Sequence, residues 1–154
     1  MEKLTLSSPA FKEGETIPRK HTADGPDQSP ALEWSKPPAA TKSLALLCED
    51  PDAPRGLWVH WVLWGLSPDS SSLPEGVAKE KTIRGGAKQG KNDFGRIGYG
   101  GPSPPPGKPH RYYFKLYALD SVLTLEPGAS RAEMVRAMEG HILAQGELMG
   151  RYGR

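Results

Sequence analysis

Two aspartates and two histidines stand where a folded chain could bring their side chains together. Asp50 and Asp52 belong to an Asp-Pro-Asp-Ala-Pro segment. His60 lies inside an apolar run, and His110 follows a loop rich in glycine and proline. An ionisable side chain next to apolar residues costs free energy unless it is paired, so it is kept for structure or for a site. Imidazole N–H groups can donate to phosphate or carboxylate oxygens, so these residues predict a small pocket for an anion.

Each of these residues also has a purely structural interpretation. Short carboxylates accept hydrogen bonds from nearby amides, and such bonds alone would explain Asp52 in a rigid proline-containing turn. A histidine among tryptophans and valines, as His60 is, is often a core residue whose ring is satisfied internally. His110 favours a site, because Tyr112 follows on the same face of an extended segment. The glycine-rich loop before it also exposes backbone N–H groups that can hold a phosphate.

Two enzyme classes fit the sequence less well. The aspartates and histidines include the side-chain types of a metal site, yet no spacing such as H-x-x-x-H or C-x-x-C puts two ligands on one element. A serine hydrolase would need a motif such as G-x-S-x-G, which does not occur. Cys48 lies in an apolar run, where a thiol is usually inert. We therefore expect a protein that is not an enzyme and that needs no cofactor and no metal.

The candidate residues must be positioned by extended segments. Residues 58–66 are rich in aromatic and β-branched residues, which favours a buried strand. Residues 43–48 form a compact apolar run that also predicts a buried strand, and residues 111–119 alternate between two faces. Shorter strands are expected near residues 4–6 and at residues 31–34. Residues 84–110 hold eight glycines and five prolines, which predicts a long loop with little regular structure.

The end of the chain has a different pattern. Ser130 and Glu133 have the spacing of a capping box, which marks the start of a helix. Apolar residues such as Met134, Met138 and Ile142 then recur at spacings of three and four. This spacing predicts a helix over residues 130 to about 146, with the methionines packed on its inner face.

Length and composition limit the possible classes of protein. A chain of 154 residues predicts one domain over residues 1–154, and 18 glycines with 16 prolines predict many turns. The longest mostly apolar stretch, residues 57–66, is too short for a helix to cross a membrane. The absence of a signal-like apolar run and a single cysteine favour a cytoplasmic protein. A net charge of +2 argues against a general nucleic-acid binder.

Positive charge is nevertheless concentrated in one stretch of the sequence. Residues 79–115 carry nine basic and two acidic residues, a local charge of +7. Such a segment could attract an anion. It could equally be a run of solvated loop charges.

Four segments of the chain together show a family pattern. They read QSPALEWSKPP, CEDPDAPRGLWVHWVLWGL, NDFGRIGYGGPSPPPGKPHRYYFKLYALD and ELMGRYGR. In combination they resemble the phosphatidylethanolamine-binding protein family, in its bacterial and archaeal branch related to Raf kinase inhibitor protein. The resemblance covers nearly the whole chain. It implies a mainly β fold, in which a large antiparallel sheet packs on a second sheet with a helix near the C-terminus, and a small anion pocket at one sheet end.

The resemblance also implies which residues line that pocket: Asp50, Trp58, His60, Gly101, Pro105, His110 and Tyr112. The histidines and loop amides would donate to phosphate-like oxygens, as in a phosphoethanolamine-like ligand, while Asp50 would orient a histidine or meet the cationic end of a zwitterion. Ala53-Pro54 is a candidate cis peptide. The expected function is therefore non-enzymatic binding of a small anionic or phosphorylated ligand. The alternative is a kinase- or signalling-regulatory interaction module with a protein partner, and a homodimer is expected by family analogy alone.

Overall fold

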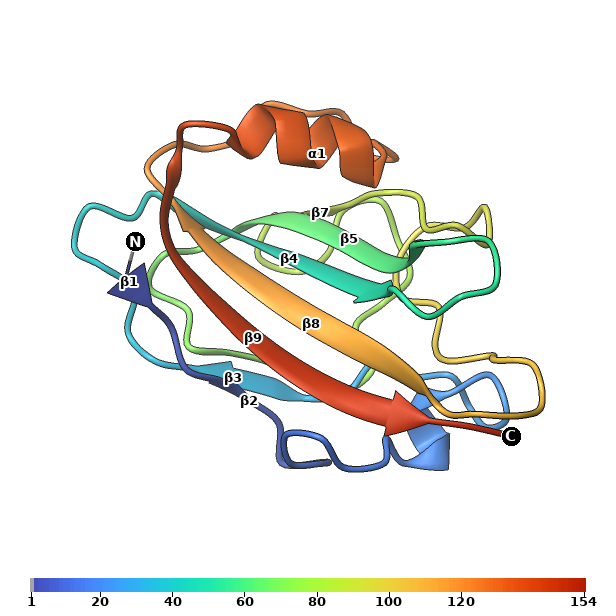
Figure 1. Cartoon of the computed structure of the whole chain (residues 1–154). Helices are drawn as coiled ribbons and strands as arrows, with labels where there is room; N and C mark the ends of the chain where they lie inside the picture. Colours follow the sequence, from blue (N-terminus) through green and yellow to red (C-terminus); the bar gives the residue numbers. More distant parts are fainter. Residues whose placement is uncertain (1) are drawn as a thin grey trace.

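The computed structural model describes residues 2–154 and arranges them as two β-sheets with one α-helix (Figure 1). The large sheet has six strands in the order β1-β9-β8-β4-β5-β7, and the small sheet has three in the order β2-β3-β6. The strands are β1 (Glu2–Lys3), β2 (Leu6–Ser7), β3 (Leu32–Trp34), β4 (Ser43–Asp50), β5 (Trp58–Leu66), β6 (Ser72–Leu73), β7 (Lys88–Gln89), β8 (His110–Leu119) and β9 (Ile142–Tyr152). The helix α1 spans Arg131–Met138, and a short 3-10 helix spans Arg19–His21. Met1 lies outside the described residues.

The predicted mainly β fold, with two sheets and a helix near the C-terminus, is confirmed. One detail of the large sheet differs from the expectation, because it is mixed rather than wholly antiparallel. Strand β1 pairs with β9 in parallel, while the other neighbours in the sheet are antiparallel. The short segment at the start of the chain thus covers the edge of β9.

The large sheet is covered on both faces (Figure 1). One face packs against the small sheet and the N-terminal segment, and their apolar side chains form the larger core cluster. The other face packs against α1 through Met134 and Met138. Strand β4 lies in the middle of the sheet and is buried at all eight positions, as its apolar sequence predicts.

The order of the central strands brings the candidate residues to one end of the sheet. Strand β4 pairs with β5 on one side and with β8 on the other, both antiparallel. The last residue of β4 therefore lies beside the first residues of its neighbours, and Asp50 is paired with Trp58. His110 opens β8 at the same end. The three segments that the sequence predicts as the longest strands are thus the ones that build the site.

The C-terminal helix is shorter than the sequence predicts. The capping box at Ser130 and Glu133 is present, with the Ser130 side chain accepting from the N–H of Glu133. The helix ends at Met138, and Gly140 has a φ of +79°, a conformation that favours glycine and breaks the helix. Residues 142–152 form strand β9 and not a continuation of the helix, so the predicted helix is wrong over residues 139–146.

Glycines on the buried face of β9 explain this error. The buried positions alternate as Ala144, Gly146, Leu148 and Gly150, a strand pattern that small residues hide. A Cβ at Gly146 would lie 2.7 Å from the carbonyl oxygen of Leu4. These positions are small because the N-terminal segment packs closely over them, and such long-range packing leaves no periodic apolar signal.

The long loop between β5 and β8 has little regular structure, as predicted. Between these strands the structure places two two-residue strands, β6 and β7, and within residues 84–109, where little regular structure was predicted, it places only β7 and isolated bridges. No helix in residues 2–154 has both the length and the apolar character that a membrane crossing requires.

Candidate functional site

A cavity of about 150 Å³ opens at the end of the large sheet where β4, β5 and β8 meet. We call it the inner pocket. Its lining comes from strand ends, from the turn after β4 and from the long loop: Asp50, Ala53, Pro54, Trp58, His60, Phe94, Ser103, Pro104, Pro105, His110 and Tyr112. Six of the seven residues that the family resemblance implies line this one cavity, and Gly101 is the exception.

Asp50 fixes the orientation of His110 in the lining of this pocket. Nδ1 of His110 lies 2.7 Å from Oδ2 of Asp50, and the Asp50 side chain is almost wholly buried. The other oxygen of Asp50 accepts the backbone N–H of Asp52 at 2.7 Å. Because a carboxylate only accepts hydrogen bonds, Nδ1 carries the proton and Nε2 is the ring nitrogen left for a ligand. Both oxygens of Asp50 are thus committed to positioning its neighbours.

His60 is held in the same manner by a backbone carbonyl. Its Nδ1 donates to the carbonyl oxygen of Gly100 at 2.6 Å, and the N–H of Gly100 donates back to the His60 carbonyl at 2.9 Å. Burial lowers the pKa of His60 below its usual range, although the Gly100 carbonyl and nearby carboxylates oppose this shift. At neutral pH the ring is therefore neutral, and its Nε2 carries a lone pair. A bound anion would favour protonation of this nitrogen.

Aromatic rings form the walls of the inner pocket. The Phe94 ring packs edge-on to Trp58 and His60, with centroids 5.6 Å and 5.4 Å apart. The Tyr112 ring packs edge-on to the other side of His60 at 5.2 Å. Burial raises the pKa of the Tyr112 hydroxyl, so it stays protonated and can donate. These contacts hold the imidazole of His60 in one orientation.

Phe94 is a lining residue that the sequence reasoning missed. It lies in the glycine-rich loop, and its N–H donates to the Asn92 side chain at 2.9 Å. The Asn92 amide in turn donates to the Gly98 carbonyl, which closes the loop on itself. The only sequence signal was an isolated aromatic residue within a polar loop.

The turn after β4 is fixed by Asp52, which points away from the inner pocket. Its Oδ2 accepts from the backbone N–H and from Nε of Arg111, both at 2.9 Å, and its Oδ1 accepts from the guanidinium at 2.8 Å. This hydrogen bonding to Arg111 lowers the pKa of Asp52 to about 2. The neighbouring Ala53-Pro54 bond, a candidate cis peptide from the sequence, is trans, since residues 2–154 contain no cis peptide. The turn is instead closed by the Gly56 N–H, which donates to the Ala53 carbonyl.

Gly101 is not among the residues that line the inner pocket. Its N–H donates to Oδ1 of Asp27 at 2.7 Å, so this amide is already occupied. A Cβ at this position would lie 2.4 Å from both that oxygen and the carbonyl oxygen of His21. Gly101 faces a neighbouring cavity of about 390 Å³. Its role is to let two loops approach closely.

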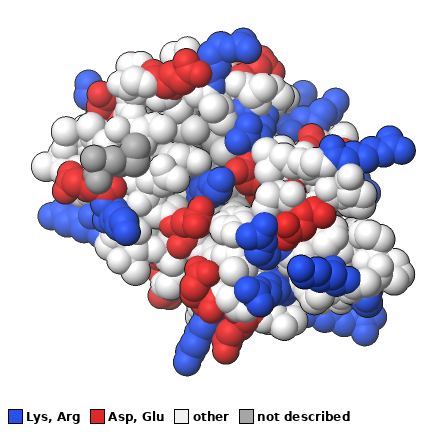
Figure 2. Space-filling view, viewed as in Figure 1, with Lys and Arg blue, Asp and Glu red and all other residues white. Residues whose placement is uncertain are grey.

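The basic residues of the segment 79–115 do not form one patch. Several are paired with carboxylates: Lys79 with Asp27, Arg111 with Asp52, and Lys115 with Glu49. Figure 2 shows Lys and Arg side chains gathered near the end of the sheet where β8 begins and β9 ends, with acidic groups between them.

Within residues 2–154, no group of three or more His, Cys, Asp and Glu side chains could hold a metal ion. Burial raises the pKa of the Cys48 thiol, which keeps it protonated.

Comparisons with known proteins agree with this architecture. The family model described as phosphatidylethanolamine-binding protein matches residues 7–153. A protein of Methanothermobacter thermautotrophicus named UPF0098 protein is 49% identical over 98% of this chain and 99% of its own length. A crystal structure of a phosphatidylethanolamine-binding protein homologue from Chlamydia trachomatis superposes with a TM-score of 0.90 at 45% identity, covering 100% of this chain and 99% of that one. YbcL of Escherichia coli, described as a member of the mammalian family of these proteins, superposes with a TM-score of 0.92 at 33% identity over 99% of both chains.

Proposed function

Because the chain belongs to the phosphatidylethanolamine-binding protein family, we propose that its inner pocket binds a small phosphorylated or anionic ligand without converting it. The observation that carries this proposal is the shared arrangement of two histidines. In His60 and His110 the Nδ1 atom is engaged by an oxygen acceptor, which leaves both Nε2 atoms at one cavity. Two fixed imidazoles can converge on one anionic group, either by accepting the hydroxyl proton of a phosphate monoanion at Nε2 or, once protonated there, by donating to its oxygens.

The size of the pocket favours a small group. About 150 Å³ lies below the usual range of cavities for drug-sized molecules, which begins near ~300 Å³. A phosphate or carboxylate head fits such a space better than a large ring system does. The aromatic walls of Trp58, Phe94 and Tyr112 lower the polarity around the ligand, which strengthens charge-assisted hydrogen bonds.

The absence of conversion is proposed from the hydrogen bonds of the histidines. The Nδ1 atoms of all four histidines pair with backbone carbonyls or carboxylates, and although Ser103 lines the inner pocket, no hydrogen bond within residues 2–154 joins a histidine ring to a serine or cysteine. Nucleophilic catalysis needs a hydroxyl or thiol within hydrogen-bonding reach of a base. The pocket is therefore better suited to holding an anion than to attacking it.

Titration calorimetry with phosphoethanolamine, and separately with inorganic phosphate, tests the proposal. We expect saturable binding to the unmodified protein and a loss of roughly tenfold or more in affinity in His60→Gln and in His110→Gln, because a hydrogen bond to a charged ligand contributes ~1.5 to 3 kcal/mol. His141→Gln is the matched control, since His141 pairs with Asp120 at the far end of β8. Saturable binding that is unchanged in both pocket variants would refute the proposal.

A further inference from the structure

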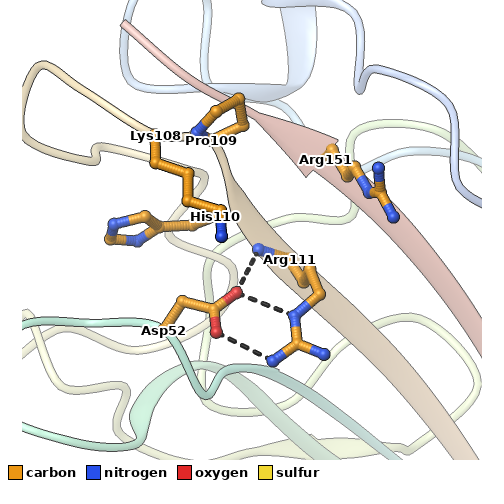
Figure 3. A pocket seen from close by; sticks show the side chains of 6 residues that line it. All are labelled: Asp52, Lys108, Pro109, His110, Arg111 and Arg151. Carbon is orange, nitrogen blue, oxygen red and sulfur yellow. Dashed lines mark hydrogen bonds and ion pairs between the residues drawn. The ribbon is translucent and has the colours of Figure 1, made fainter.

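A second and larger cavity adjoins the inner pocket and shares His110 with it. This cavity, of about 610 Å³, is lined by Asp52, Lys108, Pro109, His110, Arg111 and Arg151, and we call it the outer groove (Figure 3). In Figure 3 the imidazole of His110 extends away from Arg111, whose guanidinium pairs with Asp52. Because His110 lines both cavities, the outer groove meets the inner pocket at this residue.

Two cations of the outer groove have no carboxylate partner. Arg111 already has a carboxylate partner, because Asp52 accepts from its Nε and one terminal nitrogen, while the Tyr113 hydroxyl accepts from the other terminal nitrogen at 3.2 Å. Neither Lys108 nor Arg151 forms an ion pair with any carboxylate in residues 2–154. Among the side chains that line the outer groove, three cations and one carboxylate therefore leave an excess of two positive charges.

The register of the sheet places two of these cations side by side. Arg111 of β8 lies directly opposite Arg151 of β9, so the two side chains share one face of the sheet. Like charges in directly opposed positions destabilise a sheet. Asp52 compensates one of the two arginines, and Arg151 is left for an anion from outside.

The two cavities differ in size in a way that suggests one extended ligand. The inner pocket admits little more than an anionic head, whereas the volume of the outer groove lies within the usual range for a small-molecule site. A ligand whose head binds at His60 and His110 must place the rest of its body outside the inner pocket. His110 lines both cavities, so a ligand that leaves the inner pocket beside His110 enters the groove that Lys108 and Arg151 line.

The cavity on the opposite side is a weaker candidate for this extension. Phe94 lines both that cavity and the inner pocket, and its ring is packed against Trp58 and His60. The cavity also contains the Asp27 carboxylate, which already holds Lys79. Its excess positive charge is smaller than that of the outer groove.

We propose that the outer groove is a second anion subsite, in which Lys108 and Arg151 bind the distal anionic group of a small ligand whose proximal anionic group occupies the inner pocket. The ligand class is accordingly a small molecule with two anionic groups, of the bisphosphate or phosphocarboxylate type. This assignment rests on the proposed function of the inner pocket, and it adds a second point of recognition to it.

Calorimetry with two matched series of synthetic probes tests the assignment. One series is alkane bisphosphonates with chains of one to six methylene groups, and the other is alkyl monophosphonates of equal chain length, all at constant ionic strength. We expect at least one bisphosphonate to bind about tenfold more tightly than its monophosphonate. In the double variant Lys108→Gln/Arg151→Gln, the bisphosphonate should bind no more than about twofold more tightly than its monophosphonate, while monophosphonate affinity is unchanged. Lys36→Gln/Lys42→Gln, which removes the same charge from exposed positions away from the groove, should leave the advantage intact.

The outcomes separate the outer groove from the inner pocket. If monophosphonates bind through His60 and His110 but no bisphosphonate gains affinity, the second subsite is refuted and the inner pocket stands. If bisphosphonates gain affinity equally in the Lys108/Arg151 and Lys36/Lys42 variants, the gain is general charge attraction and the assignment is wrong. If monophosphonates do not bind and bisphosphonates bind only through Lys108 and Arg151, the inner-pocket function fails and the outer groove alone is an anion site, which overturns the two-point ligand.

Discussion

The imidazole of His110 and the carboxylate of Asp50 form a buried pair, with Nδ1 of the histidine 2.7 Å from Oδ2 of the aspartate. The two residues are 60 positions apart in the chain and meet because β4 and β8 are neighbours in the sheet. A buried carboxylate next to an anion site would repel the ligand if it faced it directly. Its two committed hydrogen bonds instead make it a positioning group for His110 and for the turn after β4.

Replacement of Asp50 distinguishes the positioning role from direct contact with a ligand ammonium group. We expect Asp50→Asn to weaken phosphoethanolamine and ethyl phosphate to a similar extent, about tenfold, because both depend on the orientation of His110. Calorimetry with the two ligands provides the measurement. A loss confined to phosphoethanolamine would mean that Asp50 contacts the amine, in conflict with the positioning role.

The lowered pKa of His60 predicts a pH dependence of stability. The unfolded chain takes up a proton on His60 below its ordinary pKa of about 6.5, whereas the folded chain resists this, so the free energy of unfolding should decrease as pH falls below that value. In His60→Gln this part of the pH dependence should be missing. Urea denaturation of both proteins at about pH 8 and about pH 5.5 gives the comparison.

Anion binding should oppose that loss of stability. Sulfate, which does not titrate in this range, would favour the protonated form of His60, so its stabilising effect should be larger at about pH 5.5 than at about pH 8. The His60→Gln protein serves as the reference for non-specific salt effects. An equal effect of sulfate at both pH values in the unmodified protein would show that the ligand does not engage His60.

Gly101 is expected to matter for stability and not for ligand contact. Gly101→Ala places a Cβ 2.4 Å from the Asp27 carboxylate and the His21 carbonyl, and overpacking of this kind costs about 1 to 3 kcal/mol. Chemical denaturation should show this loss, with phosphate affinity of the folded protein nearly unchanged. Unchanged stability together with abolished binding would instead place Gly101 in the ligand site. Gly107→Ala is a control in open space, though its φ of +134° adds backbone strain.

Glu49 anchors α1 to the sheet and should be sensitive to replacement. Its buried carboxylate accepts from Lys115 of β8 and from Arg131 of α1. Glu49→Gln should lower the free energy of unfolding by about 1 to 3 kcal/mol; the loss is limited because both cations are partly exposed and can reach water. The exposed Glu33→Gln on β3 should change stability little. Equal stability of the two variants would show that these ion pairs do not hold the helix in place.

Local sequence patterns predicted the strands that build the inner pocket. The run from Trp58 to Leu66 is a strand with the predicted bounds, and β8 begins only one residue earlier than expected. Apolar and aromatic side chains on these strands are buried mainly by their own sheet and its two covering layers, so the local pattern carries the information. The sequence also predicted that Asp50, His60 and His110 could converge on one pocket, because each of them was assigned to a strand end or to the inside of a strand.

Other parts of the fold depend on contacts distant in the sequence. Gly146 and Gly150 hide the strand period of β9, because their side-chain space is filled by Leu4, Phe11 and Ile17 from the start of the chain. The sequence could not show that Gly101 lies outside the lining of the inner pocket, because its amide donates to Asp27, which is distant in the sequence. The sequence did not indicate that Arg151 could bind a ligand, because that proposal depends on its position opposite Arg111 in the sheet.

The most direct test of the central claim is a titration of phosphoethanolamine followed by NMR of the four histidine side chains. His21 and His141 are internal controls, because His21 is bonded to the Gln28 carbonyl and His141 lies at the far end of the sheet. We predict that the imidazole signals of His60 and His110 shift together along one saturable curve, while those of His21 and His141 stay in place. Saturable shifts that leave both His60 and His110 unmoved would contradict the account.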